Sequence, residues 1–158
     1  MKISKITKEQ LLKNVSIRLV QEKDLQRIYE IEIKSFKTPY SFFTLQTLFW
    51  FNKEYFYVAE LKGKVIGFIV GDLRGRSYGH IVSIAVDEQY RGKGIGRCLI
   101  EKLIEKFKRK GVKIVKLEVA VSNNVAQSMY KKIGFKIVDC IEKYYSDGED
   151  AFIMEKRL

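Results

Sequence analysis

The sequence of 158 residues has little histidine, cysteine or proline: one His, two Cys and one Pro. The spacing of Cys98 and Cys140 matches neither a zinc knuckle nor a CxxC redox pair, so we expect reduced thiols and no metal site. No stretch reaches the roughly eighteen apolar residues that a membrane span needs. The basic start at residues 1–5 is not followed by an apolar segment with a cleavage site, so we predict no signal peptide and a cytoplasmic location.

Acidic residues are also few relative to basic ones, with 19 Asp and Glu against 30 Lys and Arg, a formal net charge of +11. This surplus favours an anionic partner, such as a nucleic acid, an acidic surface or a polyphosphate ligand. A nucleic-acid-binding module would carry basic residues interleaved with aromatic ones on one face. The lysines are instead scattered along the chain. A nucleic-acid-binding module is therefore the less favoured alternative.

The sequence shows no internal repeat, linker or low-complexity tract. We therefore predict a polar arm over residues 1–15 and one domain over residues 16–158. Helical periodicity predicts one helix with an apolar stripe of Leu25, Ile28, Ile31 and Ile33, and a second helix through Phe42, Leu45, Leu48 and Phe49. Asp24 and Ser41 are the predicted N-caps of these helices. Alternating apolar residues predict strands over residues 16–20, 55–61, 64–72 and 79–86.

The second half alternates strands with helices. Apolar residues at helical spacing run from Leu99 to Phe107 and end near Gly111. We predict further strands over residues 114–119, 135–140 and 151–155, and a helix over residues 125–133. This order indicates an α/β fold in which helices pack on the faces of a mixed sheet.

The strongest local signal is the glycine-rich turn Arg91–Gly96, which joins a strand ending at Ile84–Val86 to a helix. Its three glycines permit close approach, and the first helical turn presents unpaired amide N–H groups and the positive end of the helix dipole. Arg91 and Lys93 add full charges. Neither the Rossmann nor the P-loop pattern fits, because the turn lies mid-chain and no Gly-Lys-Ser/Thr follows. Taken alone, the turn is either a diphosphate cradle or a tight strand-to-helix connection.

Several ordered motifs carry a family resemblance. The run from His80 to Gly96 resembles the acetyl-CoA motif of the GNAT acetyltransferases, Arg/Gln-x-x-Gly-x-Gly/Ala. The family's next motif is matched by Leu117–Val119, Ser122, Asn123, Ala126, Tyr130 and Gly134–Phe135. The block Tyr144–Ala151 resembles that of archaeal and ribosomal-protein-type N-terminal acetyltransferases. The resemblance extends from about Ile17 to the end of the chain and does not include the polar arm.

The resemblance implies a sheet of about seven strands, splayed between the fourth and the fifth, with about four helices on its faces. It also implies acetyl-CoA as cosubstrate, its pantetheine arm along the fourth strand and its diphosphate on the turn. Asn123 would bond the pantetheine, although Asn is also a common N-cap. The implied cofactor-binding residues are Ile84, Ala85, Val86, Arg91, Gly92, Lys93, Gly94, Ile95, Gly96, Asn123 and Tyr130.

Three residues are the predicted catalytic groups. Tyr130 would lie near the thioester sulfur, where a protonated phenol can donate to a leaving thiolate, unless it is simply a core aromatic. Glu118 and His80 are the candidate bases, and Glu118 lies on a strand between apolar neighbours that should face the other way. Either could instead be structural, and the sequence leaves open which one dominates. A Cys98–His80 nucleophile pair is a further, disfavoured possibility.

The resemblance implies an N-acetyltransferase that acts on protein or nascent-peptide N-termini, including those of ribosomal proteins, by direct attack of the amine on the thioester. A protein α-amine has a pKa near 7.7–8.0, so modest help from a base is enough. The predicted peptide-binding residues are Phe36 and Tyr40 in one loop and Tyr144 and Tyr145 in another. Acetylation of lysine or of a small amine is the alternative reaction. We expect a monomer or weak homodimer without a membrane partner.

Overall fold

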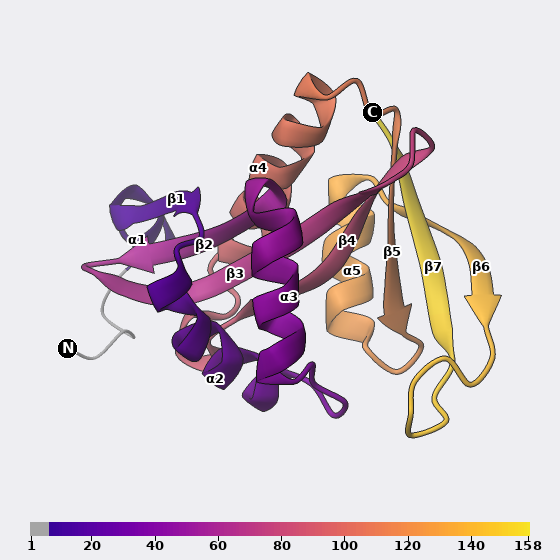
Figure 1. Ribbon diagram of the computed structural model, residues 1–158, viewed down its shortest axis with the longest axis horizontal. Helices are drawn as coiled ribbons and strands as arrows, with labels where there is room; N and C mark the ends of the chain where they lie inside the picture. The colour runs from indigo at the N-terminus through magenta and orange to yellow at the C-terminus, as the bar shows by residue number, and fades with distance from the viewer. Residues whose placement is uncertain (1–6) are drawn as a thin grey trace. The chain divides into compact units, whose positions relative to one another are not determined.

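The computed structural model describes residues 7–158 (Figure 1). Within this range, seven strands form a mixed sheet in the order β1-β2-β3-β4-β5-β7-β6, which confirms the predicted α/β class. The strands are β1 (Val15–Leu19), β2 (Phe56–Leu61), β3 (Lys64–Arg74), β4 (Tyr78–Val86), β5 (Ile114–Ala120), β6 (Lys136–Ile141) and β7 (Ala151–Arg157). The α-helices are α1 (Lys8–Asn14), α2 (Leu25–Ser35), α3 (Phe42–Asn52), α4 (Ile95–Arg109) and α5 (Asn124–Ile133).

The predicted polar arm lies partly outside the described residues, because residues 1–6 are not among them. Its remainder contains helix α1, which begins with a capping box between Thr7 and Gln10. Leu11 of this helix is buried. The chain forms two compact units: one contains the described residues up to Val70 together with Ser83–Leu103, and the other contains Gly71–Val82 and Ile104–Leu158. We call them unit 1 and unit 2 and describe each separately.

Unit 1 contains α2 and α3, whose contact includes an edge-to-face pair of Tyr29 and Phe42 rings with centroids 5.8 Å apart. Ser41 caps α3 as predicted, since its hydroxyl accepts a hydrogen bond from Thr44 N at 3.1 Å. Strands β2 and β3 form the predicted hairpin. The fully buried side chains of unit 1 include Ile28, Leu45, Phe56, Ile66, Phe68 and Leu99.

The predicted stripe of α2 is wrong at its last position. Ile33 is 44% exposed, whereas Glu32 is only 1% exposed. In a helix, the buried face that contains Leu25 and Ile28 continues at i+7, which is position 32. The carboxylate of Glu32 therefore occupies a core position, where an apolar residue was predicted. Asp24, the predicted N-cap, forms no capping bond to α2 and instead accepts hydrogen bonds from Arg18 and Gln21 N.

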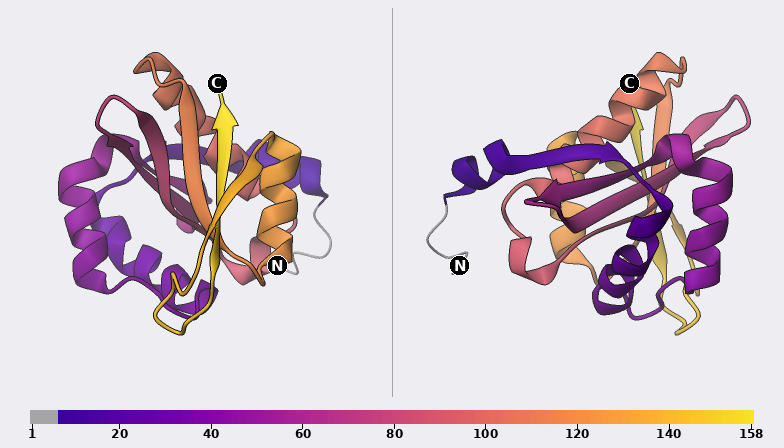
Figure 2. Two further views of the ribbon diagram at one scale, coloured as in Figure 1. Left: turned by 90° about the vertical axis from the view of Figure 1, so that its right-hand side faces the viewer. Right: turned by 60° about the vertical axis from the view of Figure 1, so that its left-hand side comes forward.

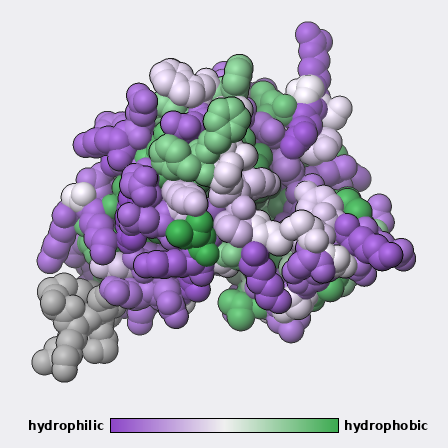
Figure 3. All heavy atoms as spheres, turned by 60° about the horizontal axis from the view of Figure 1, so that its bottom comes forward, coloured by the Kyte–Doolittle hydropathy of each residue, from purple (hydrophilic) through white to green (hydrophobic). Residues whose placement is uncertain are grey.

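Helix α3 leaves an aromatic stripe exposed. Phe43, Trp50 and Phe51 are all more than half exposed, and they lie at i, i+7 and i+8. The Lys53 ammonium lies 5.8 Å from the centre of the Trp50 ring. Figure 3 shows apolar side chains gathered among polar ones on this side of the molecule. The predicted stripe is correct for Leu45 and Phe49, which are buried.

Unit 2 is built around β7, which pairs antiparallel with both β5 and β6. Figure 2 shows β7, in yellow, running between these two strands. Residues Gly79–Ile81 of β4 pair in parallel with Val115–Leu117 of β5. Helix α5 runs from Asn124 to Ile133 and is followed by Gly134 as its C-cap, as predicted within one residue. The buried side chains of this unit include Phe107, Val115, Leu117, Phe135 and Met154.

Gly79 is required by close packing in unit 2. A Cβ atom at this position would lie 2.8 Å from the Phe107 ring. We expect Gly79→Ala to lower the free energy of unfolding by about 1–3 kcal/mol, the usual cost of overpacking. Urea denaturation measures this change. Phe107→Leu in the same chain should recover part of the loss, and strictly additive effects of the two substitutions would contradict the contact.

Candidate active site

The two candidate bases meet in unit 2. His80 lies on β4 within the short parallel pairing to β5, and Glu118 is the first β5 residue after Leu117, the last residue paired with β4. The His80 Nε2 and Glu118 Oε2 atoms are 2.6 Å apart. The His80 side chain is 10% exposed and that of Glu118 is 24% exposed. The strands thus place a nearly buried imidazole in direct contact with a carboxylate that retains access to solvent.

The second nitrogen of His80 faces two charged groups of β3. Arg74 Nη2 lies 3.1 Å from His80 Nδ1, and Asp72 Oδ1 lies 3.4 Å from it. Burial lowers the pKa of His80, but the hydrogen bonds and negative charges of Asp72 and Glu118 outweigh it and raise the pKa to about 9. His80 therefore carries a positive charge at neutral pH. Neither Asp72 nor Arg74 was among the site residues expected from sequence.

Tyr144 belongs to the same group in unit 2. Burial raises the pKa of its phenol, the negative charge of Glu118 raises it further, and the positive charge of Arg74 lowers it. Its ring packs edge-to-face against that of Tyr145, with centroids 5.0 Å apart. The predicted peptide-binding pair of tyrosines therefore lies within electrostatic range of the predicted base.

Two acidic residues brace this tyrosine loop. Glu149 Oε1 accepts hydrogen bonds from Ser122 N, at 3.0 Å, and from the Ser122 hydroxyl. Asp150 Oδ1 accepts from Lys143 N at 2.9 Å. These carboxylates belong to the block Tyr144–Ala151 that carries the family resemblance, but no role was expected for them from the sequence. Because they bond backbone N–H groups, their role here is to hold the loop.

The other two predicted residues of unit 2 lie on or next to α5. Tyr130 is 6% exposed, and its ring packs against that of Phe135. Burial, followed by the effect of Tyr145, raises the pKa of the Tyr130 phenol, so it stays protonated. Asn123 Oδ1 accepts from Ala126 N at 3.1 Å, which confirms the N-cap interpretation. Its side-chain Nδ2 group is the donor that a ligand would use.

The glycine-rich turn lies in unit 1. Gly92 and Gly94 have φ angles of +73° and +91°, a left-handed conformation that favours glycine. Helix α4 begins at Ile95, and Cys98 N donates a hydrogen bond to Gly94 O at 3.1 Å. The earlier N–H groups of this turn therefore belong to the helix end, where no intrahelical acceptor is available to them.

Lys8 of α1 lies beside this turn. A Cβ atom placed on Gly94 would be 3.0 Å from Lys8 Cε and 3.6 Å from Lys8 Nζ. This lysine belongs to the predicted polar arm, and no role was expected for it from the sequence. No sequence motif marks it, because its proximity to the turn arises from tertiary packing. The structure thus adds a third cation to Arg91 and Lys93.

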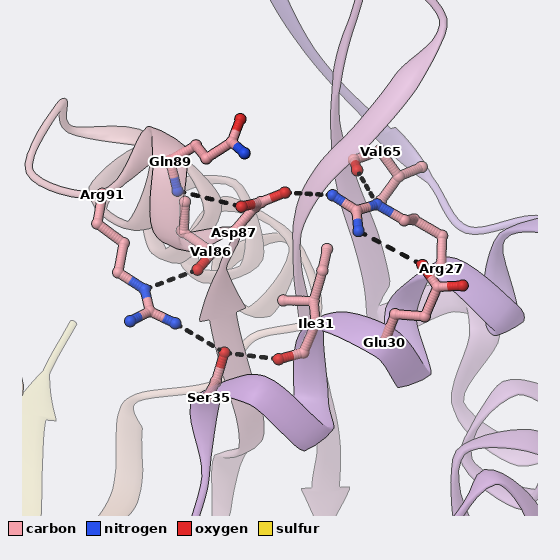
Figure 4. Close-up of polar contacts among 9 residues, drawn as sticks. All are labelled: Arg27, Glu30, Ile31, Ser35, Val65, Val86, Asp87, Gln89 and Arg91. Carbon is pink, nitrogen blue, oxygen red and sulfur yellow. Dashed lines mark hydrogen bonds and ion pairs between the residues drawn. The ribbon is translucent and has the colours of Figure 1, made fainter. Parts of the chain in front are cut away.

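The Arg91 side chain points back toward α2 (Figure 4). Its Nε donates to the Val86 carbonyl at 2.9 Å, and its Nη2 donates to the Ser35 hydroxyl at 3.0 Å. Asp87 N donates to Ile66 O on β3, so the trans peptide directs the Val86 carbonyl away from β3. The Val86 carbonyl, one of the backbone groups of the strand expected to bind pantetheine, thus accepts from Arg91 in this structure.

A hollow of about 200 Å³ lies next to Arg91, and α2 and the segment after β4 form most of its wall. Charged side chains dominate it: Arg27, Lys34, Lys64, Asp87, Glu88 and Arg91. Arg27 forms an ion pair with Asp87, as Figure 4 shows.

Phe36 and Tyr40, predicted to bind the peptide, lie between α2 and α3 and are partly exposed.

Within residues 7–158, no group of three or more His, Cys, Asp or Glu side chains is arranged to hold a metal ion. In the same range, no helix is long and apolar enough to cross a membrane. Cys98 is a free thiol whose pKa is raised by burial. Because His80 is engaged by Glu118, Asp72 and Arg74, the structure does not support a Cys98–His80 pair.

Curated relatives cover nearly the whole chain. It is 39% identical over 142 residues to an uncharacterized N-acetyltransferase of Methanocaldococcus jannaschii, covering 89% of this chain and 90% of that protein. It is 37% identical over 162 residues to an N-alpha-acetyltransferase of Sulfolobus acidocaldarius, covering 92% of this chain and 94% of that protein.

Solved structures agree with these relatives. Ard1 from Thermoplasma volcanium superposes with a TM-score of 0.89 at 32% identity, covering 92% of this chain and 98% of that one. A chain of the NatC complex bound to Gag peptide and CoA superposes with a TM-score of 0.82 at 26% identity, covering 92% and 99%. Residues 25–135 match the model of the acetyltransferase (GNAT) family. The chain therefore belongs to the GNAT family and is an acetyltransferase.

Proposed function

We propose that this acetyltransferase uses acetyl-CoA to acetylate the α-amino group of protein N-termini. The observation that carries the proposal is the 2.6 Å contact between His80 and Glu118 at the end of the β4–β5 pairing. An α-amine with a pKa near 7.7–8.0 is neutral often enough at pH 7 to need only a modest base. The N-alpha-acetyltransferase name of the Sulfolobus acidocaldarius relative supports the same substrate class.

The turn of unit 1 fits the cosubstrate. Gly92 and Gly94 adopt left-handed angles, the α4 N-terminus presents amide donors, and Lys8 supplies a nearby cation. Anions bind at such helix ends because amides and dipole act together. Acetyl-CoA would supply the acetyl thioester, and residues Arg91–Gly96 would hold its diphosphate. The backbone of Ile84–Val86, in the same unit, would hold the pantetheine arm, while a bond from the Asn123 amide stays a prediction from the sequence.

The chain's own groups then have distinct tasks. The Glu118–His80 pair receives the proton that the amine loses. Tyr130, kept protonated by burial, donates to the departing thiolate. In unit 2, Tyr144 and Tyr145 would contact the first residues of the peptide, since tyrosines can bond a backbone while packing a side chain. A peptide contact by Phe36 and Tyr40 of unit 1 stays a prediction from the sequence.

A peptide panel with labelled acetyl-CoA tests the reaction. We expect transfer to peptides with a free N-terminus and none to the same peptides with a blocked N-terminus and an internal lysine. Label on the blocked peptides would indicate lysine acetylation instead. Transfer to no peptide would overturn the proposal. Ribosomal-protein N-termini belong in the panel, because their use stays a prediction.

The Lys8 side chain should contribute to cofactor affinity. We expect Lys8→Gln to weaken CoA binding about two- to fivefold, the usual size of one exposed charge contact, with a smaller effect at high salt. Isothermal titration calorimetry with CoA measures it. Lys13 of the same helix pairs with Glu9 and is the matched control. Equal losses of CoA affinity for Lys8→Gln and Lys13→Gln would contradict a specific contact between Lys8 and the cofactor.

A further inference from the structure

Four charged side chains form one network in unit 2, and the expected catalytic pair is only half of it. Asp72 and Arg74 lie two residues apart on β3 and so share a face of the strand. Arg74 Nε bonds Asp72 Oδ1 at 3.1 Å, and both residues reach His80 Nδ1. On the other side of the ring, His80 Nε2 contacts Glu118. His80 is thus held through both nitrogens.

Asp72 and Arg74, the two partners of His80 Nδ1, require opposite protonation states of this nitrogen. Asp72 accepts only, so it needs a hydrogen on Nδ1. Arg74 donates only, so it needs the Nδ1 lone pair. Asp72 is satisfied when His80 is an imidazolium ion, and Arg74 is satisfied when His80 is neutral with its hydrogen on Nε2.

Both arrangements keep a hydrogen on Nε2, where Glu118 accepts it, because imidazole is a much stronger base than a carboxylate. In the imidazolium form His80 has no lone pair. In the neutral form its one lone pair already accepts from Arg74. His80 therefore has no site for the amine proton in either form. Glu118 has a second carboxylate oxygen, and its side chain is 24% exposed.

We propose that Asp72 and Arg74 are positioning residues that keep a hydrogen on His80 Nε2, so that Glu118, and not His80, accepts the proton of the attacking amine. This inference rests on the proposed function for its chemical meaning. During transfer a carbon–nitrogen bond forms and the carbon–sulfur bond breaks, while the sulfur keeps the electron pair and takes a proton from Tyr130, which solvent then reprotonates. The nitrogen loses one proton, which Glu118 receives and later returns to solvent.

Charge balance supports this arrangement. With His80 as imidazolium, the two cations and two carboxylates of the network sum to zero. The paired charges also explain the direction for Asp72, since burial raises its pKa but its bonds with His80 and Arg74 lower it overall. Tyr144, a further titratable group near this network, stays neutral because burial and the charge of Glu118 raise its pKa. Removing the charge of Asp72 or of Arg74 should therefore change the pKa of the His80 imidazole.

The sole histidine makes the test direct. Untagged protein with ¹⁵N-labelled histidine gives one imidazole in an NMR spectrum, whose nitrogen shifts report tautomer and pKa without peptide or cofactor. We expect Nε2 to stay protonated from pH 6 to 10. Asp72→Asn should lower the His80 pKa, and Arg74→Gln should raise it, each by on the order of one unit. Asp139→Asn, an exposed carboxylate of β6, should leave the His80 pKa unchanged.

Opposite shifts in these two variants cannot come from general loosening, which would move both toward the ordinary histidine value. Shifts in the same direction, no shifts, or an unprotonated Nε2 near neutral pH would overturn the inference. In the transfer assay, Asp72→Asn should lower kcat and leave KM for acetyl-CoA unchanged. If no peptide is acetylated but the NMR shifts appear as expected, the proposed function fails while the positioning of His80 stands.

Discussion

Replacing Glu118 with Gln should lower kcat for peptide acetylation by about 10²–10⁴-fold, the usual contribution of a general base. Gln keeps the shape and still accepts a hydrogen bond from His80 Nε2, but it cannot take up a proton at neutral pH. KM for acetyl-CoA should be nearly unchanged, because Glu118 lies outside the cofactor turn. Steady-state kinetics at saturating acetyl-CoA measure both constants.

Glu155→Gln is the matched control for this variant. Glu155 lies on β7, next to β5, and its carboxylate is 3.8 Å from the Lys116 ammonium. The substitution removes the same charge from the same unit without touching His80. We expect activity near that of the unaltered protein. A Glu118→Gln enzyme that keeps most of its kcat would show that the amine proton goes elsewhere.

Replacing Glu32 with Gln should stabilise the protein at alkaline pH. Glu32 is buried on α2, and its Oε1 atom accepts a hydrogen bond from the Ser83 hydroxyl at 2.9 Å. Burial raises the pKa of this carboxyl from 4.5 to about 7, although the Ser83 bond opposes the rise. A Gln side chain carries no charge and can keep the bond to Ser83.

The change of stability with pH follows from the pKa of Glu32 in the unfolded and the folded protein. The unfolded carboxyl ionises near pH 4.5 and the folded one near pH 7, so stability falls as pH rises across that window. At pH 8 the buried charge costs about 3 kcal/mol, which Glu32→Gln should largely recover, whereas the gain should be small near pH 5. His80 adds its own fall between pH 6.5 and about 9, but it is common to both proteins and cancels in their difference.

Urea denaturation at pH 5 and pH 8 measures this effect. Glu30→Gln is the matched control, since Glu30 lies on the same helix, is 46% exposed and pairs with Arg27. That variant should show little change in stability at either pH. A gain for Glu32→Gln that is equal at both pH values would contradict ionisation of a buried Glu32.

Local patterns in the sequence predicted much of the fold. Ser41 marked the start of α3, Gly134 marked the end of α5, and the alternation around Glu118 marked β5, because these signals depend on neighbours in the chain. The same motifs predicted His80 and Glu118, which the structure brings into contact.

The remaining site residues could not be predicted in this way. Asp72 and Arg74 read as ordinary charged residues at a strand end, and only the adjacency of β3 and β4 places them at His80. Lys8 lies beside the glycine turn through tertiary packing of α1, which the sequence near Lys8 does not reveal. Glu32 has the helical spacing of a core position. Because its side chain is charged, a pattern of apolar residues did not predict that it is buried.

The acceptor amine is the central question, and one peptide can answer it. A peptide with a free N-terminus and an internal lysine would be incubated with the protein and acetyl-CoA, and tandem mass spectrometry would locate the acetyl group. The α-amine proposal predicts that the acetyl group lies on the N-terminal nitrogen, with the lysine unmodified. Acetyl on the lysine side chain, or a peptide left unmodified, would contradict it.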